Sequence, residues 1–204
     1  MPTNSEKREL VFATNNPHKL SEIRRIVGDS IRILSLADID CFEEIPETAP
    51  TLEGNSLLKA RWIKDRYGKD CFADDTGLMV DALGGEPGVM SARYAGPDCS
   101  PEDNMTLLLK NMTGIKNRKA RFATVITLIE GDKVSTFTGE VAGRIAERRD
   151  GTAGFGYDPI FIADESGMTF ANMDADAKNA ISHRGRATAK LLDYLKSQIS
   201  LQST

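Results

Sequence analysis

The stretch Phe72-Ala-Asp-Asp-Thr-Gly-Leu78 places two adjacent carboxylates directly after a short apolar run. Residues 71–73 are apolar, as in a buried strand, and Asp74 and Asp75 follow at once. Mg²⁺ binds oxygen ligands and usually takes one or two carboxylates together with substrate phosphate, so the acids could form a metal site. The same residues could form only a turn, because Asp, Thr and Gly all favour turns. Taken alone, these residues favour the turn.

The composition indicates a globular protein that binds neither nucleic acids nor membranes. The chain has 204 residues, of which 40% are hydrophobic and 27% charged, and we expect a single domain over residues 1–204. A net charge of −4 argues against a nucleic-acid partner. No apolar run approaches the length of a membrane span, and the polar residues 1–9 lack the apolar core of an export signal.

The cysteines favour a cytoplasmic location. Cys41, Cys71 and Cys99 are scattered, and their odd number and wide spacing argue against a disulfide framework or a zinc site. Unpaired thiols of this kind fit the reducing cytoplasm.

A strand, a turn and a helix are predicted near the start of the chain. Residues 10–13 read as a strand, after which Asn16 can cap a helix and Pro17 suits its first position. His18 and Lys19 then fall in the first helical turn, which is the unfavourable end for cations. Either an anion is bound there by backbone N–H groups and Lys19, or Lys19 points into water at small cost.

Further elements follow from periodicity and turn residues. We expect strands at residues 31–36, 120–130, 133–139 and 160–162, and helices at 55–67, from 101 and after 182. The segment 41–53 is acidic and broken by prolines, and we expect a loop there. Such a loop is usually only solvated, but this one could also lend a carboxylate to a cation at the acidic pair. Lys59 lies beside the apolar face of its helix.

Two segments in the last third of the chain could meet a ligand. Phe155 lies between Gly154 and Gly156, so its ring could stack on a planar base or simply pack into the core. Ser182 is a natural helix cap, and His183, Arg184 and Arg186 crowd the turn that follows it. Because two helices begin with misplaced cations, we favour a ligand rich in oxygen over cations that are merely exposed.

Four sequence blocks together resemble a known family, the inosine-triphosphatase or Ham1-like pyrophosphatases of non-standard purine nucleoside triphosphates. The blocks occur in the family's order and span nearly the whole chain. They are Thr14-Asn-Asn-Pro-His-Lys19; Asp74-Asp-Thr-Gly-Leu78 with Leu83-Gly-Gly-Glu-Pro-Gly88 and Ser91-Ala-Arg-Tyr-Ala-Gly96; Gly154-Phe-Gly-Tyr-Asp-Pro159; and Lys178 with Ser182-His-Arg184.

The resemblance implies a Mg²⁺-dependent hydrolase that cuts between the α- and β-phosphates and releases a nucleoside monophosphate and pyrophosphate. The implied substrates are ITP, dITP and XTP, and the implied role is to cleanse the nucleotide pool. The implied fold is α/β: an elongated mixed sheet flanked by helices, in two lobes with a central substrate cleft. The family also implies a homodimer.

The resemblance assigns roles to individual residues. The triphosphate would be held by Thr14, Asn15, Asn16, Pro17, His18, Lys19 and Lys59. The base and sugar would be held by Phe155, Gly156, Tyr157 and Asp158. The base edge or nearby phosphate oxygens would be reached by Lys178, His183 and Arg184.

Asp75 would be both proton acceptor and metal ligand, with Asp74 as an alternative acceptor. Thr76 stands where a substrate-contacting serine is usual and keeps the hydroxyl. Glu47 is the best match to the second acidic ligand, but the alignment of the proline-rich loop can slip, so Glu44 stays an alternative.

Two other functions stay open. One is a related pyrophosphatase that acts on pyrimidine nucleotides such as dTTP or UTP. The other is a nucleotide-binding module without turnover, against which the intact acidic pair argues.

Overall fold

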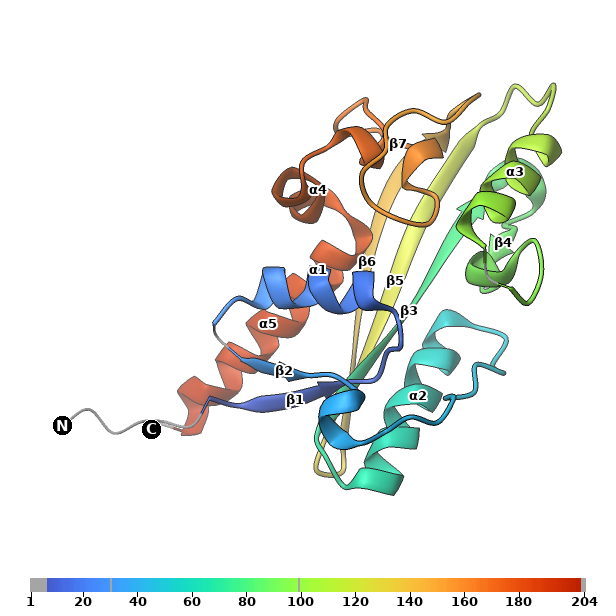
Figure 1. Ribbon diagram of the computed structural model, residues 1–204. Coiled ribbons are helices and arrows are strands. Elements are labelled where there is room, and N and C mark those ends of the chain that lie inside the picture. The colour runs from blue at the N-terminus through green and yellow to red at the C-terminus, as the bar shows by residue number, and fades with distance from the viewer. Residues whose placement is uncertain (1–6, 30, 99, 203–204) are drawn as a thin grey trace. The chain divides into compact units, whose positions relative to one another are not determined.

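A computed structural model describes residues 7–29, 31–98 and 100–202, so Cys99 lies outside the described residues (Figure 1). The strands are β1 (Glu9–Phe12), β2 (Arg32–Leu34), β3 (Cys71–Val80), β4 (Pro87–Gly88), β5 (Lys119–Glu130), β6 (Lys133–Ile145) and β7 (Phe161–Ala163). The α-helices are α1 (Pro17–Val27), α2 (Leu52–Tyr67), α3 (Pro101–Asn111), α4 (Ala175–Ile181) and α5 (His183–Gln202).

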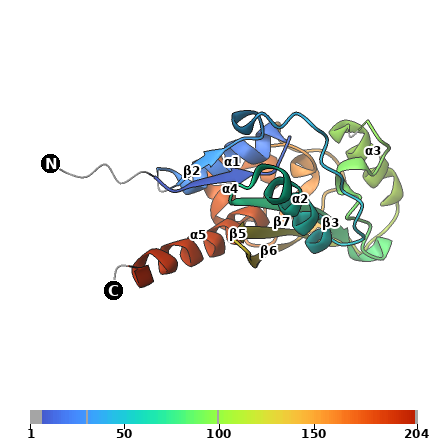
Figure 2. The ribbon, with the colours of Figure 1, turned by 90° about the horizontal axis from the view of Figure 1, so that it is seen from below.

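The sheet is mixed, in the order β2-β1-β3-β5-β6-β7, and β4 pairs with β3. Strand β1 is parallel to β2 and to β3, whereas β4 and β7 are antiparallel to their neighbours. Strands β1 and β2 lie side by side in both views of the ribbon (Figures 1 and 2). The predicted α/β class with a mixed sheet and flanking helices is therefore confirmed.

The described residues group into two compact units. The first unit takes its residues from 1–75, 125–137 and 188–204, and the second from 76–124 and 138–187. The boundary passes through β3 between Asp75 and Thr76. The expectation of one domain with a cleft between two lobes stays a prediction.

In the first unit, β1 and β3 present their alternate residues to different helices. Val11 and Cys71 pack in one apolar cluster with Ala60 and Ile63 of α2. Successive side chains of a strand point to opposite faces, so Phe72 and the residues in phase with it face away from α2. Neighbouring residues of β3 therefore lie on opposite faces of the sheet, and only one of these faces packs against α2.

The second unit has its own core, built between β3 to β7 and helix α3. Met105, Leu108 and Met112 line the buried side of α3, as their helical spacing predicts. They pack against Phe122 and Phe161, whose ring centroids are 4.7 Å apart. These methionines are core residues, and the predicted cap at Ser100 is confirmed because its side chain accepts from the N–H of Asp103.

The turn favoured at Asp74 and Asp75 is wrong, because β3 continues unbroken from Cys71 to Val80. Local propensity favours a turn, but β3 pairs with β1, β4 and β5, and each acid meets a cation from another element. Two smaller differences concern helices: α2 begins at Leu52 with Thr51 as its cap, ahead of the predicted start, and α4 was not predicted.

None of the helices in the described ranges has the length and apolar content that a membrane span requires.

Candidate active site

A carboxylate–lysine cluster lies in the first unit. Lys59 of α2 is only 6% exposed, and its Nζ donates to Glu47 Oε1 and lies 3.7 Å from Asp75 Oδ1. The Nδ2 of Asn55 donates to Asp75 Oδ2 at 3.1 Å, and Asn55 Oδ1 accepts from the N–H of Ala49 at 2.9 Å. Asn55 thus ties the acidic loop to the acid on β3. We define Glu47, Asn55, Lys59 and Asp75 as the acid cluster.

Sequence reasoning missed Asn55, although a signal was present. Asn55 and Lys59 are four residues apart on α2, so both side chains lie on one face of the helix. The signal was the spacing of Asn55 and Lys59, which allows one partner for both side chains, and the structure shows this partner to be Asp75.

The electrostatics of the acid cluster raise the pKa of both Asp75 and Lys59. Burial raises the pKa of Asp75 above that of an ordinary aspartate, although Lys59 and Lys19 act in the opposite direction. For Lys59, burial lowers the pKa, but the nearby carboxylates of Asp75 and Glu47 outweigh it, and the pKa is raised overall. Lys59 therefore stays charged beside a carboxylate that accepts protons readily.

Asp74 meets a different lysine from its neighbour. Lys19 of α1 donates from Nζ to Asp74 Oδ1 at 2.9 Å, and Asp74 is completely buried. Its side chain points to the face opposite to that of Asp75, as alternation along a strand requires. Lys19 does not point into water, so that alternative is wrong, and its placement in the first turn of α1 is explained by this pairing.

The helix cap expected at Asn16 is confirmed. Asn16 Oδ1 accepts from the N–H groups of His18 at 3.0 Å and Lys19 at 3.2 Å, and Pro17 stands at the first position. The N–H of Asn16 itself donates to Thr14 Oγ1 at 3.1 Å. The segment 14–19, which includes the exposed Asn15, is thus locally braced. Its role in holding a triphosphate stays a prediction.

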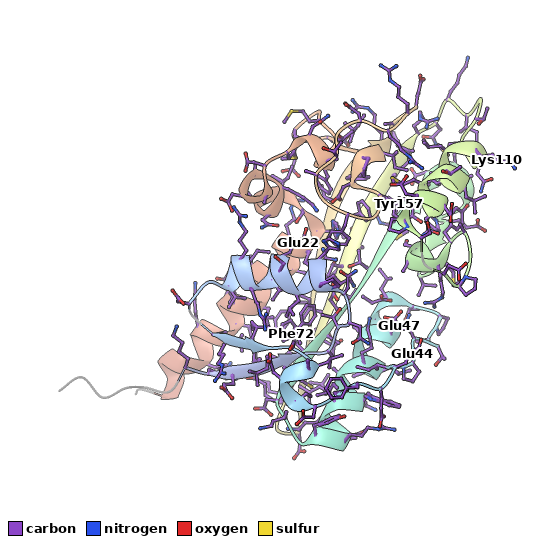
Figure 3. All side chains as sticks on the ribbon, viewed as in Figure 1. Glu22, Glu44, Glu47, Phe72, Lys110 and Tyr157 are labelled. Carbon is purple, nitrogen blue, oxygen red and sulfur yellow. The ribbon has the colours of Figure 1, made fainter. Side chains whose placement is uncertain are left out.

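The structure distinguishes the two glutamates proposed as the second acidic ligand. Both come from the segment that leads into α2 (Figure 3). Glu47 contacts Lys59, which also meets Asp75, whereas Glu44 is exposed. The geometry therefore favours Glu47.

A second cluster lies in the second unit and surrounds Phe155. Asp158 Oδ2 accepts from the backbone N–H of Phe155 at 2.8 Å and from Lys178 Nζ at 2.7 Å. Lys178 Nζ is 5.1 Å from the centre of the Phe155 ring. Gly154 has φ +79°, and a Cβ there would overlap the Asp158 carboxylate, so this loop requires glycine.

The start of α5 adds buried cations to this cluster. Arg184 is 2% exposed and donates from Nη2 to Thr76 Oγ1 at 3.2 Å. Its Cζ lies 5.5 Å from the centre of the Phe155 ring. The ring of His183 stacks on Phe122 at 4.5 Å. Ser182 caps the helix, since its Oγ accepts from the N–H of Gly185 at 3.0 Å. His183 and Arg184 are buried, so the alternative of merely exposed cations is wrong for these two residues, whereas the side chain of Arg186 is 36% exposed and pairs with Glu165. We define Thr76, Phe155, Asp158, Lys178 and Arg184 as the aromatic cluster.

Tyr157 lies in the core of the second unit. Its hydroxyl donates to the carbonyl oxygen of Ser91 at 2.7 Å, and burial raises its pKa. The side chain therefore anchors the loop that carries Phe155 and Gly156. Contacts of Tyr157 and Gly156 with a base or sugar stay predictions.

The acid cluster fits a magnesium ion by its donor set. Among the described residues, no three His, Cys, Asp or Glu side chains form a group that could hold a metal by themselves. Mg²⁺ does not need such a cage, because it commonly takes one or two carboxylates and completes its shell with water and substrate phosphate. Glu47 and Asp75 already converge on one cation, the ammonium of Lys59.

The fold and the two clusters define an α/β protein whose paired carboxylates and lysines suit a phosphate-bearing ligand. The chain belongs to the Ham1 family, whose model matches residues 10–194. The family predicted from the sequence blocks is thereby confirmed.

The chain is similar to several known relatives. It is 55% identical to a dITP/XTP pyrophosphatase of Flavobacterium johnsoniae, over 92% of this chain and 97% of that protein. It is 50% identical to a dITP/XTP pyrophosphatase of Porphyromonas gingivalis, over 92% of this chain and 97% of that protein. Among solved structures, the Ham1 protein of Staphylococcus aureus superposes with a TM-score of 0.85 at 36% identity, covering 94% of this chain and 100% of that one.

Proposed function

We propose that this protein hydrolyses the non-standard purine nucleotides dITP, XTP and ITP to the monophosphate and pyrophosphate. Membership of the Ham1 family and the named activity of its relatives support this substrate class. The observation that carries the chemistry is the acid cluster, in which Lys59 joins Glu47 to an aspartate with a raised pKa. Such turnover would keep these nucleotides out of DNA and RNA.

Mg²⁺ is the proposed cofactor, with Glu47 and Asp75 as the protein ligands. When bound, it would neutralise phosphate oxygens and make a coordinated water more acidic. The lysines contribute independently of the metal: the ammonium groups of Lys19 and Lys59 offer donors to the oxygens of a triphosphate. Positioning of the reacting groups and stabilisation of the developing charge supply most of the rate enhancement in phosphoryl-transfer reactions.

Asp75 is the proposed proton acceptor, in preference to Asp74. Water attacks the α-phosphorus, the bond to the bridging oxygen breaks, pyrophosphate leaves, and the proton of the water passes to Asp75. Asp74 is completely buried and paired with Lys19, so its role is to hold that lysine.

The aromatic cluster is the proposed site for the base. Hypoxanthine and xanthine present a carbonyl at position 6, where adenine presents an amino group. Arg184 is only a donor, so it can pair with the carbonyl but not with the amino group. A site that leaves buried donors unpaired rejects the wrong base strongly. Phe155 supplies the stacking surface, with Lys178 and His183 as further donors.

A nucleotide panel tests the proposed function. Purified protein is incubated with dITP, XTP, ITP, dATP, GTP, dTTP and UTP, with Mg²⁺ or with EDTA, and monophosphate and pyrophosphate are separated by chromatography. We expect pyrophosphate release from the first three with Mg²⁺ only. Preferred turnover of dTTP or UTP would indicate the pyrimidine alternative, and binding without turnover would indicate a non-catalytic module.

We also propose that the protein is a homodimer, as the family resemblance implies. Light scattering on the purified chain measures its molar mass, and a monomer mass of 22.3 kDa would refute this.

A further inference from the structure

Strand β5 carries two hydroxyl groups within a fully buried run. Residues 122–129 are all buried, and the polar members of this run are Thr124 and Thr127, each with 0% exposure. A buried hydroxyl needs a hydrogen-bond partner. Thr127 Oγ1 lies 2.7 Å from Ser56 Oγ in the first unit, and Thr124 Oγ1 lies 2.7 Å from Thr76 Oγ1 in the second.

The two hydroxyl pairs differ in the next group to which each is hydrogen-bonded. Ser56 Oγ donates onward to the backbone carbonyl of Glu53, so the Thr127 pair ends within helix α2. Thr76 Oγ1 instead accepts from Arg184 Nη2 at 3.2 Å. A guanidinium group has no acceptor, so the direction of this hydrogen bond is fixed. The Thr124 pair therefore reaches a side chain of the aromatic cluster.

We propose that Thr124 is a positioning residue for base discrimination, acting through Thr76 on Arg184. This inference rests on the proposed function and deepens it by adding a residue that does not touch the substrate. Thr76 is β-branched, so its side chain has few rotamers, and the hydroxyl of Thr124 selects the one that receives the guanidinium. Arg184 is thereby held against Phe155, at 5.5 Å from the ring centre.

Valine at position 124 keeps the shape of threonine and removes the hydroxyl. The oxygen of Thr76 then faces a methyl group and can still accept from Arg184, but the hydrogen bond that fixes the rotamer of Thr76 is gone. We expect kcat/KM for dITP to fall about 10-fold in Thr124→Val, as for loss of a buried hydrogen bond. The ratio of kcat/KM for dITP over dATP should fall by a similar factor, because the donor no longer distinguishes the two bases.

Thr127→Val is the matched control. Thr127 shares with Thr124 its strand, its complete burial and its 2.7 Å hydroxyl pair, but not the connection to Arg184. Both valine variants should lower the melting temperature, whereas only Thr124→Val should change the preference for dITP over dATP. Thr124→Ser restores the hydroxyl and should restore the preference.

The experiment measures kcat/KM for dITP and dATP with Mg²⁺ for the wild type and these three variants. If Thr124→Val is insoluble, Thr124→Ala removes the same hydroxyl without added apolar bulk and carries the same expectation. An unchanged preference in a folded Thr124→Val or Thr124→Ala protein overturns this inference alone. A wild type that does not hydrolyse dITP overturns the proposed function and this inference together.

Discussion

The ammonium nitrogen of Lys59 lies 3.7 Å from Asp75 Oδ1. The same nitrogen contacts Glu47, so one buried cation serves two carboxylates that would otherwise repel each other. A cation is thus a structural requirement of this position. That requirement explains why a lysine is buried on α2.

Removing Lys59 should make the stability of the fold depend on Mg²⁺. In Lys59→Met the two carboxylates face each other without their ammonium, and we expect a loss of about 3 kcal/mol in EDTA. Saturating Mg²⁺ should recover part of this loss, so the Mg²⁺-induced rise in melting temperature should exceed that of the wild type. Thermal unfolding with and without Mg²⁺ measures the difference.

Lys64→Met is the control for this measurement. Lys64 lies on the same helix, and its Nζ is 2.8 Å from Asp70 Oδ1, outside the acid cluster. Its melting temperature should respond to Mg²⁺ as the wild type does. An equal Mg²⁺ response in Lys59→Met and the wild type would contradict the metal assignment.

The pairing of Lys19 with Asp74 should contribute strongly to stability. Lys19→Met leaves a completely buried carboxylate without this partner, and we expect a loss of about 3–5 kcal/mol in unfolding free energy. Adding Asp74→Asn removes the buried charge and should restore most of the stability, whereas activity should stay low because the ammonium of Lys19 no longer meets the phosphates. Denaturant unfolding and pyrophosphate release measure the two effects.

Lys7→Met provides the comparison for an exposed pair. Lys7 Nζ lies 3.2 Å from Asp29 Oδ1 at the surface. Loss of this ion pair should change the free energy of unfolding by less than about 1 kcal/mol. Equal losses in Lys7→Met and Lys19→Met would show that the burial of Asp74 carries no energetic weight.

Cys71 should resist alkylation in the folded protein. Burial raises the pKa of its thiol to about 12, and its Sγ donates to the carbonyl oxygen of Ala60. At about pH 8 on the order of one thiol in ten thousand is then the reactive thiolate. Iodoacetamide treatment followed by peptide mass spectrometry should show modification of Cys71 only after unfolding. Rapid labelling in the native state would contradict this placement.

The same shift predicts a pH dependence of stability. In the unfolded chain the thiol loses its proton near its ordinary pKa, whereas in the fold it keeps the proton to about pH 12. Stability is therefore lost as the pH rises from about 9 through about 12. Cys71→Ala should show a shallower loss over this range.

The sequence predicts elements well where local signals decide them. The caps at Asn16 and Ser100 are local, because each side chain accepts from an N–H two or three residues ahead. The acid pair on β3 was not predictable in this way. Its strand conformation comes from pairing with β1 and β5, and its carboxylates pair with Lys19 and Lys59, which come from distant helices.

Close approaches between backbone segments were also not predictable from the sequence. Gly139 lies within β6, where a Cβ would overlap the backbone oxygen of His183 at the start of α5. Nothing in the residues around Gly139 indicates that another segment comes so near. Most of the predicted site residues lie in the four sequence blocks, and Glu47 and Lys59 lie outside them, whereas Asn55 and Thr124 emerged only from the contacts.

We propose that Asp75 takes the proton of the attacking water. The most direct test is pyrophosphate release from dITP with Mg²⁺ by Asp75→Asn, compared with Asp65→Asn, which changes an exposed acid on α2. We expect Asp75→Asn to keep the fold, judged by circular dichroism, and to lose activity by at least roughly a hundredfold. Asp65→Asn should behave as the wild type. Near-normal pyrophosphate release by folded Asp75→Asn would contradict the claim.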